Sequence, residues 1–193
     1  MTTEQKEIIK KLYASIQEEE RGLITQLKNT ALMQSIQLGD YTWSAFDKDE
    51  SGNTYFLLDP EFVGIENFGD NSNYMSSNAR IYANNCDASK QALNILGKES
   101  FEPVKLDLLS HDGSGSYGIC KSDLFGVRTY DMQRKNYKTI KRCSMPEYLS
   151  TSESTEDGWS TCCVQYVLSD GGVRFGGCRW DGGGVRPFFI LKS

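Results

Sequence analysis

The densest glycine cluster of this chain lies near its C-terminus and excludes a helical end to the fold. Seven of the 18 glycines fall between positions 171 and 184. Glycine in a helix interior costs about 1 kcal/mol relative to alanine, so this stretch predicts turns and short strands. Within it, Asp170-Gly171 is a hairpin-turn signal, because these residues readily adopt the positive φ angles of tight turns. The assignments that follow are strands at 161–168 and 173–175, a turn at 169–172 and an apolar closing strand at 185–191, with Pro187 at an edge or bulge.

Period-two patterns further upstream also indicate β-structure. Segments 41–46 and 54–58 flank a polar run at 47–53, which predicts a β-hairpin. The polar run is similar to the start of a calcium loop, but Leu58 stands where a bidentate Glu belongs, so we expect a solvated turn. The remaining assignments are a strand at 106–109, a flexible loop at 111–118 and a surface loop at 150–157.

Residues 3–34 show the periodicity of a helix. The apolar residues that recur at spacings of three, four and seven are Ile9, Leu12, Ile16, Leu23 and Leu27. Gly22 leaves open a kink or two shorter helices. We interpret the stripe as packing on its own domain, with a short coiled coil as the alternative. Shorter helices are expected at 89–96, ended by Gly97, and at 129–140.

Charge and hydropathy exclude several classes of partner. The formal net charge of −5 argues against a nucleic-acid partner. A local basic cluster is interpreted as a solvated face rather than a phosphate-binding patch; it consists of Arg134, Lys135, Lys138, Lys141 and Arg142. No segment approaches the roughly 20 apolar residues of a membrane span. The first 11 residues lack the apolar core of a signal peptide, so we expect synthesis in the cytoplasm without general secretory export, unless the protein leaves on a larger particle.

Neither a metal nor a cofactor is expected. The six cysteines form no Cys-x-x-Cys pair and His111 is the single histidine, which argues against zinc. Cys162 and Cys163 are adjacent and would point to opposite faces of a strand, so we expect reduced, mostly buried thiols. The glycine-rich stretch 111–118 lacks the Lys-Ser/Thr of a phosphate loop, which argues against a nucleotide cofactor.

Catalytic constellations are also poorly represented. A Ser/His/Asp site would need His111 with Asp112, and no nucleophile-elbow context accompanies them. A Cys/His pair using Cys120 or Cys163 has no flanking signature. The separation of carboxylates is invisible in a sequence, so paired acids for glycoside cleavage stay open. We expect a protein that is not an enzyme, with a hydrolase that uses His111 as the alternative.

The C-terminal half carries a family resemblance. Trp159, a strand, Ser169-Asp170-Gly171-Gly172-Val173 and Gly184-Val185-Arg186-Pro187 follow one another in the order of a family of uncharacterised bacterial and phage domains. Gly39 to Trp43 and Leu106 to Ser110 resemble the opening strand and middle segment of that family. The resemblance covers about residues 36–193. It implies an α+β domain with a C-type-lectin-like (formylglycine-generating-enzyme-like) fold over 36–193 and leaves 1–35 as an N-terminal helical extension.

The same fold is shared by the variable proteins of diversity-generating retroelements, and the resemblance assigns roles on that basis. The residues expected to face a ligand are Cys162, Gln165, Arg174, Phe175, Arg179, Trp180 and Asp181. The expected scaffold residues are Trp159, Val164, Val167, Val173, Val185, Arg186 and Pro187. The family's Trp-Trp-Leu-Arg-Ser-like segment is replaced here by Trp159 to Cys163, at the start of the first displayed strand.

From the residues themselves, three of these positions have a structural interpretation as well. Phe175 is interpreted as a core residue, Trp180 is left open between core and surface, and Arg186 is expected in a buried structural pair. The resulting hypothesis is a non-catalytic recognition protein, of the phage receptor-binding, adhesin or variable-protein kind, with a protein or glycan target. Its N-terminal helix would attach it to a particle or to sister subunits. The alternative is a cytoplasmic or virion structural or interaction domain with a fixed protein partner.

Overall fold

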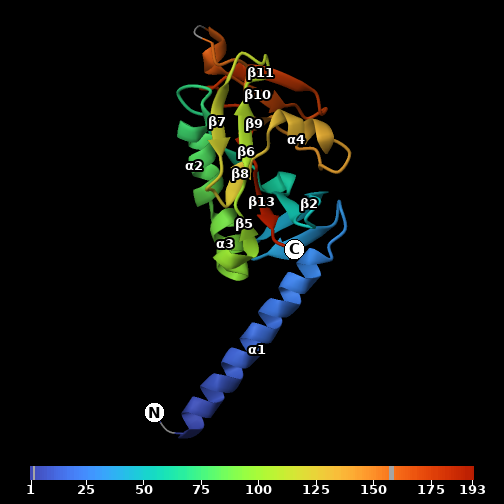
Figure 1. Ribbon diagram of the computed structural model, residues 1–193, viewed down its shortest axis with the longest axis vertical. Coiled ribbons are helices and arrows are strands. Elements are labelled where there is room, and N and C mark those ends of the chain that lie inside the picture. Colours follow the sequence, from blue (N-terminus) through green and yellow to red (C-terminus); the bar gives the residue numbers. More distant parts are fainter. Residues whose placement is uncertain (2, 157–158) are drawn as a thin grey trace.

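The structure, a computed structural model, describes residues 1, 3–156 and 159–193 (Figure 1). It is an α+β protein, as predicted, with 31% of residues in helices and 30% in strands. The α-helices are α1 (Thr3–Lys28), α2 (Asn78–Asn85), α3 (Asp87–Leu96) and α4 (Tyr130–Lys135). Single-turn 3₁₀ helices occur at Pro60–Phe62, Tyr74–Ser76, Lys98–Ser100 and Trp159–Cys162.

The strands of the described residues form three sheets. The six-stranded sheet contains β1 (Ser35–Leu38), β2 (Tyr41–Lys48), β3 (Thr54–Leu58), β13 (Pro187–Leu191) and β5 (Phe101–Glu102) in that order, with β8 (Phe125–Val127) also paired to β13. The five-stranded sheet has the order β11 (Val173–Gly177), β10 (Cys163–Val167), β9 (Glu147–Ser152), β12 (Gly184–Val185) and β4 (Gly64–Ile65). A separate hairpin pairs β6 (Leu106–Leu109) with β7 (Ser116–Cys120).

The closing strand β13 is the centre of the larger sheet. All five of its residues are buried, and alternate side chains enter two different cores. Phe188 packs with Phe46, with ring centroids 6.0 Å apart, whereas Phe189 packs 4.9 Å from Trp43 on the other face. The expectation that Pro187 lies at an edge or a bulge is therefore wrong. The sheet tolerates this proline because it is the first residue of its strand.

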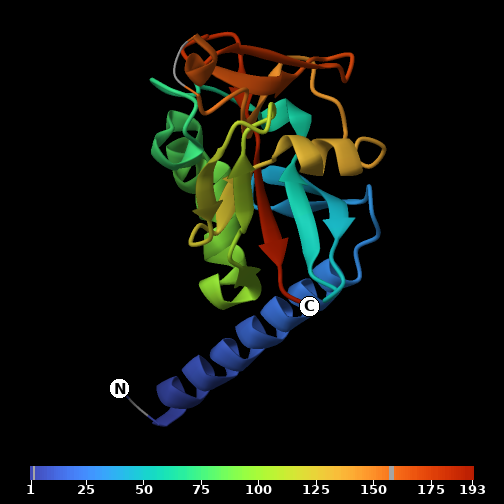
Figure 2. The same ribbon diagram turned by 45° about the horizontal axis from the view of Figure 1, so that its top comes forward.

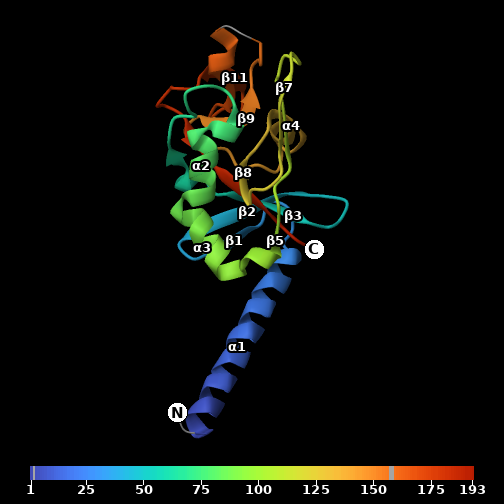
Figure 3. The ribbon, with the colours of Figure 1, turned by 60° about the vertical axis from the view of Figure 1, so that its left-hand side comes forward.

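The N-terminal helix leaves the rest of the molecule (Figures 1 and 3). It runs without a break through Gly22 and ends at Lys28, six residues before the expected end. Of its apolar stripe, Leu27 is buried in the core and Leu23 is half-buried, while Ile9, Leu12 and Ile16 are exposed. The interpretation of the stripe as packing on its own domain is wrong for its first three members, because the helix extends beyond the domain.

The strand β9 corrects the expected surface loop at 150–157. Residues 147–152 pair with β10 on one side and with β12 on the other, and all six are buried. The polar side chains that suggested a loop are buried in the sheet instead, and the Thr151 hydroxyl accepts a hydrogen bond from the Tyr130 N–H at 2.8 Å. Asp157, at the end of the predicted loop, lies outside the described residues.

Most of the other expected elements form. The hairpin of β2 and β3, the turn and return strand after β10, the strand β6 and the helix α3 with Gly97 at its end are confirmed. Two assignments need correction. The last three residues of the predicted loop 111–118 belong to β7, and the helix predicted at 129–140 ends after Lys135 because Asn136 leaves helical geometry.

Candidate functional site

The predicted ligand surface is built on the hairpin of β10 and β11. Gly171 has φ +88° in the connecting turn, which fixes the register with Tyr166 opposite Arg174 and Gln165 opposite Phe175. The strand β11 is the edge of the five-stranded sheet. The hairpin lies at the end of the molecule away from α1, as Figures 1, 2 and 3 all show.

Six of the seven predicted ligand-facing residues are exposed. They are Cys162, Arg174, Phe175, Arg179, Trp180 and Asp181. Gln165 is the exception: only 3% of it is exposed, and its side-chain amide donates to Glu153. The expectation for Gln165 is therefore wrong, because β10 is covered on both faces. The interpretation of Phe175 as a core residue is also wrong, since its place on an edge strand leaves it 55% exposed.

The exposed residues divide between two faces of the hairpin. Side chains directly opposite in an antiparallel pair share a face, and neighbours along a strand alternate. Arg174 therefore shares a face with Tyr166, whose ring lies 5.2 Å from that of Trp180. Phe175 shares the other face with Gln165. Arg174 and Trp180 thus belong to one surface and Phe175 to another.

Trp180 is held firmly although 40% of it is exposed. Its ring is tilted against Tyr166 and packs edge-on against Tyr148 at 6.3 Å. The hydroxyl of Tyr148, whose pKa is raised by burial, donates to the Trp180 carbonyl. The ring also lies on the backbone of Gly182, where an added Cβ would come 2.7 Å from the indole Nε1. These contacts fix the orientation of an exposed aromatic ring.

Other glycines of this region serve the same packing. A Cβ on Gly183 would lie 2.6 Å from Cζ of Tyr148, and one on Gly176 would lie 2.8 Å from Cε1 of Tyr166. Neither glycine has a positive φ. Three of the seven clustered glycines, Gly176, Gly182 and Gly183, thus lie against aromatic rings, and these contacts support Trp180.

A neighbouring loop extends the Trp180 surface. Arg179 forms an ion pair of 3.1 Å with Asp70, and both side chains are largely exposed. The loop is fixed beside the hairpin because the N–H groups of Phe68 and Gly69 both donate to the Cys178 carbonyl. An exposed ion pair of this kind contributes about 0–1 kcal/mol to stability, so it leaves both charges available to a ligand. No pattern in the sequence indicates Asp70, which is over 100 residues away from Arg179 along the chain.

The scaffold residues are placed largely as expected. Val164, Val167, Val185, Arg186 and Pro187 are buried, whereas Val173 is half-buried. The side chain of Trp159 lies outside what the structure describes.

The expected buried pair of Arg186 is confirmed. Its guanidinium lies 3.2 Å from Glu147, which also accepts from Arg128 at 3.0 Å. Burial alone raises the pKa of Glu147, but the two guanidinium groups outweigh that effect and the pKa is lowered. This buried cluster supports the start of β9, next to the residue Tyr148 that anchors Trp180.

His111 does not meet a catalytic partner set among its described contacts. Its Nδ1 lies 3.9 Å from Glu153, and its ring packs edge-on against Tyr130 at 4.9 Å. Asp112, the neighbour proposed for a triad, instead accepts a hydrogen bond from the Ser114 N–H at 2.9 Å and so closes its own turn.

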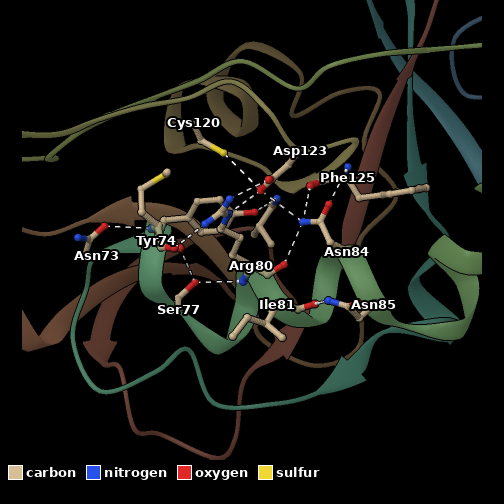
Figure 4. Close-up of polar contacts among 12 residues, drawn as sticks. Asn73, Tyr74, Ser77, Arg80, Ile81, Asn84, Asn85, Cys120, Asp123 and Phe125 are labelled. Atoms are coloured by element: carbon tan, nitrogen blue, oxygen red, sulfur yellow. Dashed lines mark hydrogen bonds and ion pairs between the residues drawn. The ribbon is translucent and has the colours of Figure 1, made fainter. Parts of the chain in front are cut away.

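A polar network that the sequence did not indicate joins α2 to the turn between β7 and β8 (Figure 4). Arg80 donates to both oxygens of Asp123 at 2.6 and 2.9 Å, and its hydrogen bonds hold the pKa of Asp123 below the usual range. Asn84 donates to the Phe125 carbonyl at 3.0 Å, and the Cys120 thiol donates to Asp123 at 3.4 Å. These groups satisfy one another, so we assign the network a structural role.

The basic cluster near α4 is also largely paired. Lys135 lies 2.7 Å from Asp47, Lys141 lies 2.6 Å from Asp59, and Arg134 lies 3.2 Å from Asp131. A shallow depression of about 650 Å³ runs along this side, and Asp47, Asp131 and Lys135 are among its lining residues. Two acids, Asp47 and Asp131, and three bases, Lys105, Arg134 and Lys135, line the depression, so their charges largely offset one another and we keep the interpretation as a solvated face.

Comparison with known proteins gave no family: no family model, no curated protein and no solved structure matches this chain. No helix in the described part of the chain combines the length and apolar character needed to cross a membrane. Among the cysteines, Cys162 is exposed, Cys86 is half-buried and the other four are buried.

Proposed function

We propose that this protein is a non-catalytic recognition protein that binds a protein or glycan ligand through the surface around Trp180. One observation carries the proposal: an exposed tryptophan whose orientation is fixed by Tyr166, Tyr148 and the Gly182 backbone. Tryptophan and arginine are the residues most enriched at binding hot spots. A ring that is already ordered loses little conformational entropy when a ligand covers it.

The groups around the ring suit a polar ligand with an apolar face. Arg174 shares the face of Trp180, and Arg179 with Asp70 lies on the adjoining loop. Both signs of charge are therefore available to hydrogen-bond hydroxyl, amide or carboxylate groups, while the indole covers an apolar patch. Phe175 points to the other face of the hairpin, so we leave it outside this surface.

We further propose a C-type-lectin-like scaffold of the kind used by retroelement-diversified variable proteins and by phage receptor-binding proteins. In support, the first strand β1 and the last strand β13 share one sheet, and the Gly-Val-Arg-Pro segment is entirely buried. Display on a phage particle belongs to this proposal. The alternative function is a cytoplasmic or virion interaction domain with a fixed protein partner.

The proposal is tested by binding of the labelled full chain to a glycan array and to a displayed random-peptide library. Trp180→Ala is expected to weaken binding of the selected ligand by tenfold or more, since hot-spot truncations cost at least about 2 kcal/mol. Phe175→Ala is the matched control, because Phe175 is an aromatic residue that is 55% exposed on the other face of the hairpin. A ligand whose affinity survives Trp180→Ala and Arg174→Ala would contradict the proposal.

Diversification is tested by deep sequencing of the gene in its population. The packing predicts substitutions at Cys162, Arg174, Arg179 and Asp181, which are exposed, and none at Gly182. Substitutions scattered evenly over the buried and exposed positions would contradict the hypothesis of a variable protein.

A further inference from the structure

The first half of α1 carries an apolar face that nothing in the described chain covers. Its members are each between 45% and 65% exposed: Ile8, Ile9, Leu12, Tyr13 and Ile16. At 100° per residue these five side chains fall within one sector of the helix, and Leu23 and Leu27 continue the same stripe into the domain. The stripe is thus buried at its C-terminal end and exposed at its N-terminal end, where the helix projects away from the domain (Figures 1 and 3).

A bare amphipathic helix of this kind needs a partner. Helix α1 spans 26 residues, or about 39 Å at 1.5 Å per residue. Isolated helices of 12–15 residues are marginal in water, and most helix stability in proteins comes from packing of the apolar face. The part before Leu23 has no such packing within the described part of the chain, so a surface that covers the stripe would stabilise this part of the helix.

The distribution of charge along α1 indicates which partner is electrostatically complementary to the helix. Lysines gather in the first half, at Lys6, Lys10 and Lys11, and the acidic run 18–20 follows the apolar residues. In a parallel pair the lysines would face lysines and the glutamates would face glutamates. In an antiparallel pair each basic half meets an acidic half. The helix is therefore complementary to itself when reversed.

The same charges disfavour a membrane surface. The helix carries five Lys and Arg and five Glu, which cancel. Helices that lie on anionic membranes present an excess of Lys and Arg on their polar face. A neutral helix with an acidic run beside its stripe lacks that attraction.

We propose that α1 is a dimerisation helix that pairs antiparallel with α1 of a second copy, with Leu12 opposite Ile16 of the partner copy. Five side chains from each copy, already half-exposed, bury on the order of 1,000 Å² in total, the size at which specific interfaces begin. The domains lie at opposite ends of the paired helices, which avoids a clash between them. Both Trp180 surfaces stay free, so the inference does not depend on the proposed ligand.

The oligomeric state is the first test, measured by sedimentation equilibrium of the full chain. The wild type is expected at twice the 21.7 kDa chain mass at micromolar concentrations, and Leu12→Gln with Ile16→Gln is expected at the chain mass. Ile81→Gln is the matched control, because Ile81 is 60% exposed on another helix, close to the 61% of Leu12. A monomeric wild type, or a dimer that survives Leu12→Gln with Ile16→Gln, overturns the proposal. Near-ultraviolet circular dichroism, which reports on the packed aromatic rings of the domain, is the check that the variant remains folded.

The orientation is tested by disulfide cross-linking through cysteines introduced in a Cys162→Ser, Cys86→Ser background, which removes the exposed and the half-buried native thiols and leaves the four buried ones. With Leu12 opposite Ile16, position 9 of one copy lies opposite position 19 of the other. A mixture of Ile9→Cys and differently tagged Glu19→Cys chains is expected to give mixed disulfide dimers at least fivefold above the like-with-like dimers. An excess of like-with-like dimers overturns the antiparallel arrangement.

Discussion

Neutralising Glu147 is expected to be the most damaging isosteric change in the chain. The carboxylate is 2% exposed and lies between two guanidinium groups, of Arg128 and Arg186, that are each 1% exposed. Replacement by Gln keeps the volume and removes the charge that both arginines require. Removing one partner of a buried ion pair costs about 3–5 kcal/mol, because the opposite charge stays buried without compensation. Two arginines share this one acid, and the amide oxygen retains part of the hydrogen bonding, so we expect about 3 kcal/mol.

The assay is urea unfolding of wild type and Glu147→Gln followed by tryptophan fluorescence, with the melting temperature as a second measure. For a chain of this size 1 kcal/mol corresponds to a few degrees, so the melting temperature should fall by roughly 6–12 °C. Asp131→Asn is the matched control: the same chemical change at an ion pair in which both side chains are more than 70% exposed should cost under about 0.5 kcal/mol. A loss below about 1 kcal/mol for Glu147→Gln would refute the reasoning.

The pH dependence gives an independent check of the same cluster. The pKa of Glu147 is lowered in the folded state, so its stabilisation is complete above its unfolded value of 4.5 and is lost as the pH falls through the lower folded value. The gap between wild type and Glu147→Gln should therefore be constant from about pH 6 to 8 and should shrink below pH 4.5. A gap that widens on acidification would contradict the sign of the shift.

Two further predictions concern the Trp180 region. Gly182→Ala is expected to destabilise the protein by about 1–3 kcal/mol, because the new methyl group overlaps the indole of Trp180. Gly177→Ala is the control, because open space surrounds its Cβ position and the loss of stability should be small. Urea unfolding of both variants measures the difference. In the native protein at pH 8, iodoacetamide should alkylate the exposed Cys162 first, whereas Cys178, whose pKa is raised by burial to about 12, should react only after unfolding. Mass spectrometry of the alkylated peptides over time measures this order. Early modification of Cys178 would contradict the packing.

The features of the fold that could be predicted from the sequence are those determined by local contacts. The Asp170-Gly171 turn sets the pairing of its flanking residues by counting outward, so the hairpin of β10 and β11 was predictable, and so was the sharing of a face by Tyr166 and Arg174. The same count separates Phe175 from Arg174, a step that the prediction of one ligand surface did not take. Gln165 was misplaced because the family resemblance assigned it to the ligand-facing set, whereas its side chain is buried and pairs with Glu153.

Contacts between distant segments account for what the sequence missed. The strand β9 looks like a loop because Ser150, Thr151 and Ser152 are polar, and it is a central strand because β10 and β12 flank it. The ion pair of Arg80 with Asp123 links residues 43 apart, and spacing on that scale carries no periodic signal. The stripe of α1 is a different case. Periodicity identified its apolar face correctly but contained no information on whether the domain or a second copy would cover that face.

The two proposed surfaces make different demands on the fold, and the fold separates them. A binding surface that tolerates changes in its exposed side chains requires a rigid support, which the glycine-packed rings of Tyr148, Tyr166 and Trp180 provide at one end. A self-association helix requires length and freedom from the core, which α1 has at the other end (Figures 1 and 3). In the antiparallel dimer the two Trp180 surfaces therefore point away from each other, across two domains and about 39 Å of helix. Such a dimer gains no avidity on one flat target, because its two sites cannot engage that target at once; its geometry suits bridging two separate targets instead.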